Sequence, residues 1–176
     1  MCRTLNVKKQ SYWQNGTGGD VYMKKPYIID ACALIDAAQH YNMSKKLFAH
    51  IWAALDRLFI NGELISCSEI MDKLKDEDLA KWAKERKDYF HPLTKELQEK
   101  TTEVLSQFPN LISIRGTSNS NADPFLIATA LLQDGSIVTN EKLGDEQGKD
   151  YKIPNACQAL GITYMNLPSF LNQILE

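Results

Sequence analysis

The sequence lacks the cysteine and histidine spacing that a structural zinc site needs. No CxxC or HxxxH pair occurs among its four cysteines and three histidines: Cys2, Cys32, Cys67, Cys157, His40, His50 and His91. A structural zinc site is therefore not expected. The first residues also lack the apolar core of a secretory signal, so we expect a cytoplasmic protein with reduced thiols.

Long apolar runs and an excess of either charge are absent as well. The apolar stretches are only a few residues long, so no membrane-spanning segment is expected. Lys and Arg number 20 and Asp and Glu 22, which gives a formal net charge of −2. If the protein binds phosphates, local sites or metal ions must supply the positive charge. With 9 Gly, 6 Pro and 44% hydrophobic residues, the chain is neither disordered nor fibrous.

The 176 residues suit one domain, preceded by a segment of different character. Residues 1–25 are polar and rich in glycine and show neither strand nor helix periodicity. We expect a flexible arm or a non-native extension there, followed by a single domain at 26–176.

From residue 27 onward, short apolar runs alternate with amphipathic segments. The runs predict strands at 27–29, 64–65, 111–114, 136–139 and 162–165. The segments predict helices around 47–59, 79–90, 97–108, 123–132, 157–160 and 170–175. The helix that opens at 123 is apolar nearly all round and should be central and buried. This alternation favours an α/β fold with a mainly parallel sheet and helices on both faces.

Four acidic residues follow four of the predicted strands. Asp30 ends the first strand, Glu69 lies just beyond the second, Asp123 opens the helix after the third, and Glu141 follows the fourth. The carboxyl ends of parallel strands share one edge of a sheet, where ligands bind. We therefore expect the four carboxylates to converge on one pocket. Thr139 adds a hydroxyl two residues before Glu141.

Converging carboxylates repel one another unless a cation or a proton neutralises them. The usual partner of an all-oxygen ligand set is Mg²⁺ or Mn²⁺. Such ions activate water and stabilise the leaving oxygen of a phosphodiester. The pattern thus predicts a metal-dependent phosphodiesterase with Asp30, Glu69, Asp123 and Glu141 as metal ligands.

Each acid also has a structural interpretation. Asp123 before Pro124 fits an N-cap with proline at the first helical position. Glu69 with Ser66 fits a capping box. Asp30 could cap the next helix, and Glu141 could be a solvated loop charge.

Three segments around these acids resemble PIN-domain nucleases. The resemblance covers 24–176: residues 27–35 resemble the opening strand and helix, 122–128 the third acidic motif and 137–141 the fourth. Residues 152–157 and the closing strand and helix are similar to the DUF4411 branch of that superfamily.

The resemblance implies a three-layer α/β/α sandwich and Mg²⁺- or Mn²⁺-dependent cleavage of RNA to 5′-phosphate and 3′-hydroxyl ends. It also implies the toxin of a type II toxin–antitoxin module, held inactive by a cognate antitoxin protein and often a homodimer. Asp30, Glu69, Asp123 and Glu141 would be the catalytic acids, with Thr139 as an accompanying hydroxyl. Two departures stand out. Ala31 and Cys32 replace the usual Thr and Asn or Ser, removing polar groups beside Asp30, and the last acid is Glu instead of Asp.

Basic residues that could hold RNA are interleaved with acids after Glu69. Most of them, Lys73 included, fit a solvated face of mixed charge. Arg115, after the predicted third strand, is the candidate RNA-binding residue. Two alternatives stay open: a non-catalytic PIN-like module that binds RNA or protein, and a phosphoryl-transfer or receiver-like domain.

Overall fold

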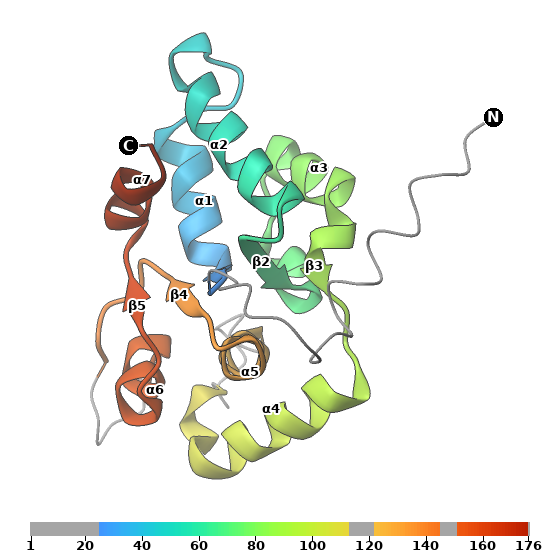
Figure 1. The fold of residues 1–176 in the computed structure, drawn as a ribbon, viewed down its shortest axis with the longest axis vertical. Helices are drawn as coiled ribbons and strands as arrows, with labels where there is room; N and C mark the ends of the chain where they lie inside the picture. The colour runs from blue at the N-terminus through green and yellow to red at the C-terminus, as the bar shows by residue number, and fades with distance from the viewer. Residues whose placement is uncertain (1–24, 113–121, 145–150, 176) are drawn as a thin grey trace, which may run out of the picture.

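A five-stranded parallel sheet runs through the middle of the structure (Figure 1). The computed structural model describes residues 25–112, 122–144 and 151–175, so the predicted arm at 1–25 lies almost wholly outside the described residues. The strand order is β3-β2-β1-β4-β5, and every neighbouring pair is parallel. The strands are β1 Tyr27–Ile29, β2 Leu64–Cys67, β3 Phe90–His91, β4 Ser136–Val138 and β5 Tyr164–Met165.

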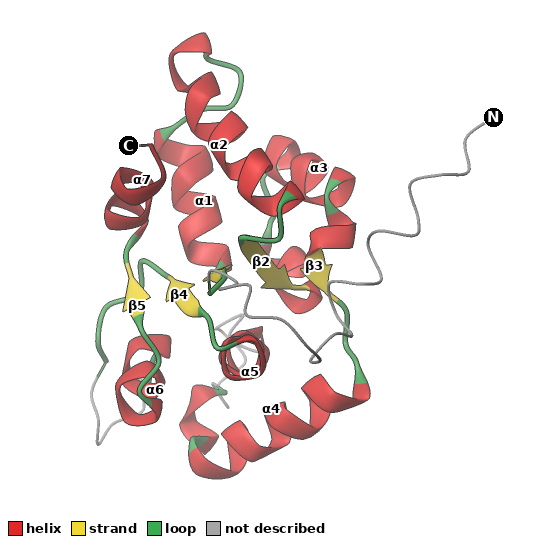
Figure 2. Cartoon of the chain, viewed as in Figure 1, coloured by secondary structure: helices red, strands yellow, loops and turns green. Residues whose placement is uncertain are grey.

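Helices cover both faces of this sheet (Figure 2). One face carries α1 Ala31–His40, α2 Ala49–Ile60, α3 Glu77–Glu85 and α7 Leu167–Leu175. The other carries α4 Lys95–Gln107, α5 Asp123–Gln133 and α6 Ile153–Leu160. Short 3₁₀ helices link them: η2 Lys46–Phe48, η3 Ser68–Lys73, η4 Lys87–Tyr89 and η5 Pro109–Leu111. The predicted three-layer α/β/α sandwich is confirmed. None of the described helices is long and apolar enough to cross a membrane.

Helix α5 is the central helix that the sequence predicts. It contacts β1, β2 and β4 on one side and α4 on the other. A helix between a sheet and a second helix has little surface left for water, which explains why it is apolar nearly all round. At its end, Asp134 adopts a left-handed conformation with φ of 49°. Gly135 then approaches β1 so closely that a Cβ there would lie 2.1 Å from Ile28 Cδ1.

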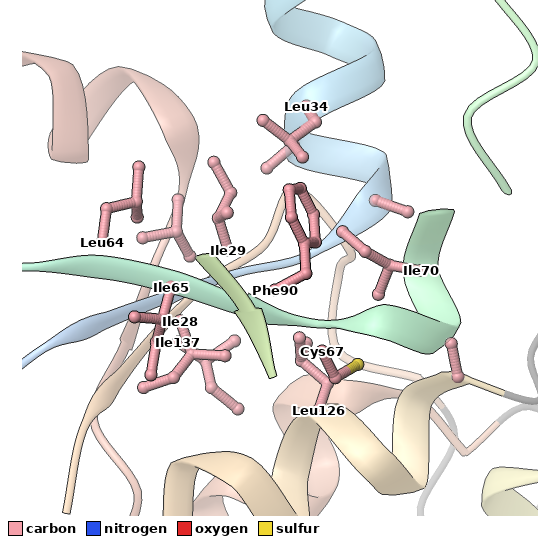
Figure 3. Close-up of a cluster of buried hydrophobic side chains, with 14 of the residues drawn as sticks. Ile28, Ile29, Leu34, Leu64, Ile65, Cys67, Ile70, Phe90, Leu126 and Ile137 are labelled. Carbon is pink, nitrogen blue, oxygen red and sulfur yellow. The ribbon is translucent and has the colours of Figure 1, made fainter. Parts of the chain in front are cut away.

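Buried side chains from the sheet point alternately into two cores (Figure 3). Ile29 and Leu64 face the side on which Leu34 of α1 lies, while Ile28 and Ile137 face the opposite side, with α5. All five side chains are fully buried. This explains why the strands are continuous apolar runs without alternating polar residues.

The third strand differs from the prediction. The segment 111–114 does not pair where it is described: Leu111 ends η5, residue 112 lies in a bend, and 113–114 lie outside the described residues. The strand forms instead at Phe90–His91, beside Ser66 and Cys67 of β2. The prediction of a helix through Phe90 was wrong because α3 ends at Glu85. Pro92 disfavours a helical conformation at His91 and favours an extended one.

Candidate functional site

Asp30 and Thr139 lie at the ends of β1 and β4, where the order in which strands are added to the sheet reverses. From β1 the chain adds β2 and β3 on one side and then crosses to β4 on the other side. Ligands of open parallel sheets bind at this switch point, at the carboxyl ends of the strands. Asp30 follows β1, and its backbone N–H donates to the carbonyl of Val138 at the end of β4 (2.9 Å). Thr139 follows Val138, so both side chains lie at the same edge of the sheet and are joined by a hydrogen bond.

The Asp30 carboxylate is only 3% exposed and fully engaged with its neighbours. Its Oδ1 accepts the Ala31 N–H (2.6 Å), which makes Asp30 the N-cap of α1. Its Oδ2 accepts from the Cys32 thiol (2.8 Å) and from the Thr139 hydroxyl (3.2 Å). Burial and then the charge of Asp30 raise the pKa of Cys32, so the thiol stays protonated and donates. Cys32 thus supplies a polar contact where the departure from the PIN pattern predicted that one was lost.

Asp123 forms a buried ion pair with Lys73. The Lys73 ammonium donates to Asp123 Oδ1 at 2.7 Å, and the two side chains are 17% and 7% exposed. The N-cap interpretation of Asp123 was wrong. The N-cap of α5 is Ala122, no side chain caps this helix, and Asp123 is the first helical residue. The Asp123 carboxylate therefore faces Lys73 instead of its own helix terminus.

Lys73 contacts one carboxylate, Asp123, and feels the charges of two more, Asp30 and Glu141. Burial by itself would lower the pKa of Lys73, but Asp123, Asp30 and Glu141 together raise it above its ordinary value. Burial raises the pKa of Asp123 to about 7; Lys73 opposes this rise, and the charges of Asp30 and Glu141 add to it. The charges of Asp30, Asp123 and Glu141 therefore act on one another, while their convergence on one pocket stays a prediction.

Glu141 joins this group from the loop after β4. Its Oε2 accepts the N–H of Ile153, the first residue of α6 (3.1 Å), and its N–H donates to Thr139 Oγ1 (3.2 Å). Burial, and after it the charge of Asp30, raise the pKa of Glu141. The hydrogen bond from the Ile153 N–H and the charges of Lys152 and Lys73 lower it in part. Glu141 is thus a held, partly buried acid, and the interpretation as a solvated loop charge was wrong.

Glu69 lies one strand away, in η3. Its Oε1 accepts from Ser68 Oγ (3.1 Å), and its Oε2 is buried without a hydrogen-bond partner among the described residues. The capping box with Ser66 was a wrong prediction, because Ser66 lies in β2 and donates to the carbonyl of Ile29 (2.6 Å). Within the described ranges, no hydrogen bond joins Glu69 to Asp30, Asp123 or Glu141.

The side chains as they lie do not form a finished metal site. In the described ranges, no group of three or more His, Cys, Asp or Glu side chains is placed to hold a metal ion. The chemistry of the donors nevertheless suits a hard divalent cation, because all are carboxylate oxygens. The buried Glu69 Oε2 lacks a partner, and Asp123 has a monovalent one in Lys73. A divalent cation that binds Asp123 would have to displace the Lys73 ammonium from its carboxylate.

Lys73 is the site residue that sequence reasoning placed wrongly. It was assigned to a solvated face, but its side chain is largely buried. The available signal was its apolar neighbourhood: Ile70 and Leu74 are buried, so this segment packs inward despite its charges. The candidate RNA-binding residue Arg115 lies outside the described residues.

Fold and site together define a parallel α/β protein with a buried group of acids at the switch point of its sheet. The chain matches the family model described as "Domain of unknown function (DUF4411)" over residues 27–174. It therefore belongs to the DUF4411 family, as the resemblance indicated. No curated protein matches it. Among solved structures, it is similar to the crystal structure of PAE2754 from Pyrobaculum aerophilum. The two are 16% identical, with a TM-score of 0.43 over 87% of this chain and 98% of that one.

Proposed function

We propose that this protein is a metal-dependent ribonuclease that hydrolyses RNA phosphodiester bonds with Mg²⁺ or Mn²⁺. The observation that carries the proposal is the buried ion pair of Lys73 with Asp123 (2.7 Å), in the field of the buried Asp30 carboxylate and of Glu141. Two buried carboxylates and a third that is partly buried are unfavourable for a purely structural protein, because each raises the free energy of the others in ionised form. In a site that binds a divalent cation, the same carboxylates serve as ligands, and the cation compensates their repulsion.

In this proposal each residue of the chain has a defined role. Asp30, Asp123 and Glu141 would hold the ion, with Glu69 from the adjacent strand end. The bound ion would activate the attacking water and stabilise charge on the phosphate. The Thr139 hydroxyl and the Cys32 thiol fix the orientation of Asp30 through its Oδ2. Backbone N–H groups at the starts of α1 and α6 do the same for Asp30 and Glu141.

The resemblance of the sequence to PIN-domain nucleases extends the proposal to a biological role. The chain would be the toxin of a type II toxin–antitoxin module, with a cognate antitoxin and a homodimer as partners. An arginine or lysine of the antitoxin would suit this group of acids, because cations pair well with carboxylates. Induced expression should arrest growth of the host, and co-expression of the neighbouring gene should relieve the arrest. Arrest that persists with Asp123→Asn would contradict this role.

The receiver-like alternative fits the fold less well. Receiver sheets have the order 2-1-3-4-5, whereas this sheet has the order β3-β2-β1-β4-β5. The residue after β3, where a receiver would carry its phosphoacceptor aspartate, is Pro92. We therefore retain the nuclease as the proposed activity.

Cleavage of labelled single-stranded RNA in Mn²⁺ tests the proposal. Asp123→Asn should lower the rate by roughly 10²–10³-fold, as expected when charge stabilisation of a transition state is lost. Asp72→Asn, which changes an exposed acid of η3, is the matched control and should cleave like the wild type. The products should carry 5′-phosphates, shown by their sensitivity to a 5′-phosphate-dependent exonuclease. Equal activity of Asp123→Asn and wild type, with identical circular dichroism spectra, would reject the mechanism.

A further inference from the structure

The Lys73–Asp123 pair is the most buried ion pair of the described ranges; the next, Arg86–Asp56, has side chains that are 21% and 32% exposed. The side chains of Lys73 and Asp123 are 17% and 7% exposed, whereas those of Lys95 and Glu99 are 90% and 64% exposed. Solvated pairs of the second kind contribute little and exchange freely with water. The ammonium of Lys73, in contrast, is held against the buried Asp123 carboxylate at 2.7 Å, largely out of contact with water.

We propose that Lys73 is a resident counter-ion that competes with the divalent cation, so that metal binding and release of Lys73 from Asp123 are one exchange. This inference rests on the proposed metal-dependent function and adds to it a residue that sets the metal affinity. Lys73 is a positioning residue in this scheme: in the metal-free protein it holds the acids together in place of the ion.

The physical reason is that placing two cations at one buried carboxylate costs much free energy. Asp123 Oδ1 already accepts from Lys73 Nζ at 2.7 Å. A divalent ion at that oxygen would lie beside the ammonium, and like charges at such distances repel strongly where water is excluded. The ion therefore binds when Lys73 leaves, and the affinity of the site includes the free energy of breaking the lysine pair.

Placement of Lys73 favours such an exchange over a fixed structural role. It is the last residue of η3, and the chain leaves the 3₁₀ helix directly after it, at Leu74. Its neighbours Ile70 and Leu74 are anchored in the core, so the backbone stays in place while the lysine side chain changes position. A lysine has four rotatable bonds and a compact charge, which suit it to switch between partners.

Titration of Mn²⁺ into the full chain, followed by calorimetry, measures the exchange. Lys73→Gln keeps an N–H donor for Asp123 but removes the charge, so the Kd for Mn²⁺ should fall by roughly tenfold or more. Lys73→Arg keeps the competing charge and should leave the Kd close to the wild-type value. Lys75→Gln removes an exposed lysine of the same segment and controls for the change in net charge; its Kd should match the wild type.

Labelling of the wild-type chain provides a second readout that needs no variant. Amine acylation followed by mass spectrometry should modify Lys73 faster when Mn²⁺ is added, because its side chain leaves the buried pair. Lys75 should be labelled at the same rate with and without the ion. This measurement decides the question even if Lys73→Gln fails to fold.

The outcomes separate this inference from the proposed function. If wild type and Lys73→Gln bind Mn²⁺ equally, the exchange is overturned while metal-dependent activity stands. If only Lys73→Gln binds Mn²⁺, the exchange is supported, but the wild-type chain is not a metal-dependent enzyme. If neither binds, both proposals fail. Should the variant not fold, an unchanged labelling rate of Lys73 in Mn²⁺ overturns the exchange.

Discussion

Asp123 shows how burial can override a favourable helix position. An acid in the first turn of a helix is normally stabilised by the helix dipole and by free N–H groups. Here the carboxylate is buried, and burial together with the charges of Asp30 and Glu141 raises its pKa to about 7. Lys73 compensates this only in part. The negative charge of Asp123 can therefore be neutralised in three ways: by a proton, by Lys73 or by a divalent cation.

This raised pKa predicts a pH-dependent stability in EDTA. In the unfolded chain Asp123 loses its proton near pH 4, but in the folded chain near pH 7. The folded state therefore binds more protons between these values, and its stability should fall as the pH rises through that window. From about pH 5 to about pH 8 the loss attributable to Asp123 should be on the order of 1–3 kcal/mol in urea unfolding.

The Asp123→Asn variant is the control for this effect. Asn resembles the protonated acid, so the variant should equal the wild type at about pH 5 and be the more stable protein at about pH 8. A pH profile of the variant that parallels the wild type would show that Asp123 is not the group responsible.

At the scale of elements, a clamp between α2 and α3 holds one flank of the fold. Asp56 of α2 accepts from Arg86 Nε (2.6 Å), from Arg86 Nη2 (2.7 Å) and from Trp82 Nε1 (3.0 Å). The Arg86 guanidinium also lies over the Trp82 ring, 4.7 Å from its centroid. Trp82 in turn packs edge-on against Trp52 and Phe59 of α2. Since η3, which carries Lys73, lies between β2 and α3, the clamp helps to hold the segment that supplies the site lysine.

Removing the shared acceptor should loosen this clamp. Asp56→Ala deprives Arg86 and Trp82 of three hydrogen bonds, two of them to a guanidinium, and should destabilise the protein by about 2 kcal/mol. Urea unfolding measures the change. Glu99→Ala, which breaks a solvent-exposed pair with Lys95, should stay within about 0.5 kcal/mol of the wild type. Similar losses in the two variants would contradict a special role for the clamp.

Sequence patterns predicted the elements that pack in regular ways and missed those that depend on neighbours. The strands β1 and β4 are apolar runs, and α5 is apolar on all sides, so their burial follows from composition. The two-residue strand β3 is too short to show a period, and only its pairing with Ser66 and Cys67 makes it a strand. Lys73 was assigned to the surface because its many charged neighbours were given more weight than the apolar Ile70 and Leu74 on either side of it.

At the scale of the whole molecule, strand order creates the site. The crossover places β4 beside β1, so that Asp30 and Thr139 meet although they lie 109 residues apart in the sequence. Helix α5 then delivers Asp123 and the start of α6 holds Glu141. Position after a strand was a sufficient guide for Asp30 and Glu141. It was not sufficient for Glu69, since the residues after β2 turn into a 3₁₀ helix whose side-chain directions the sequence does not reveal.

The central claim is that the acids at the switch point bind a divalent cation. Anomalous diffraction from crystals grown with Mn²⁺ tests this claim most directly. The account predicts a Mn²⁺ peak in contact with the carboxylates of Asp30 and Asp123, at the carboxyl ends of β1 and β4, with the Lys73 ammonium moved away from Asp123. Diffraction data that show no peak at this edge, with Lys73 still paired to Asp123 in saturating Mn²⁺, would contradict it.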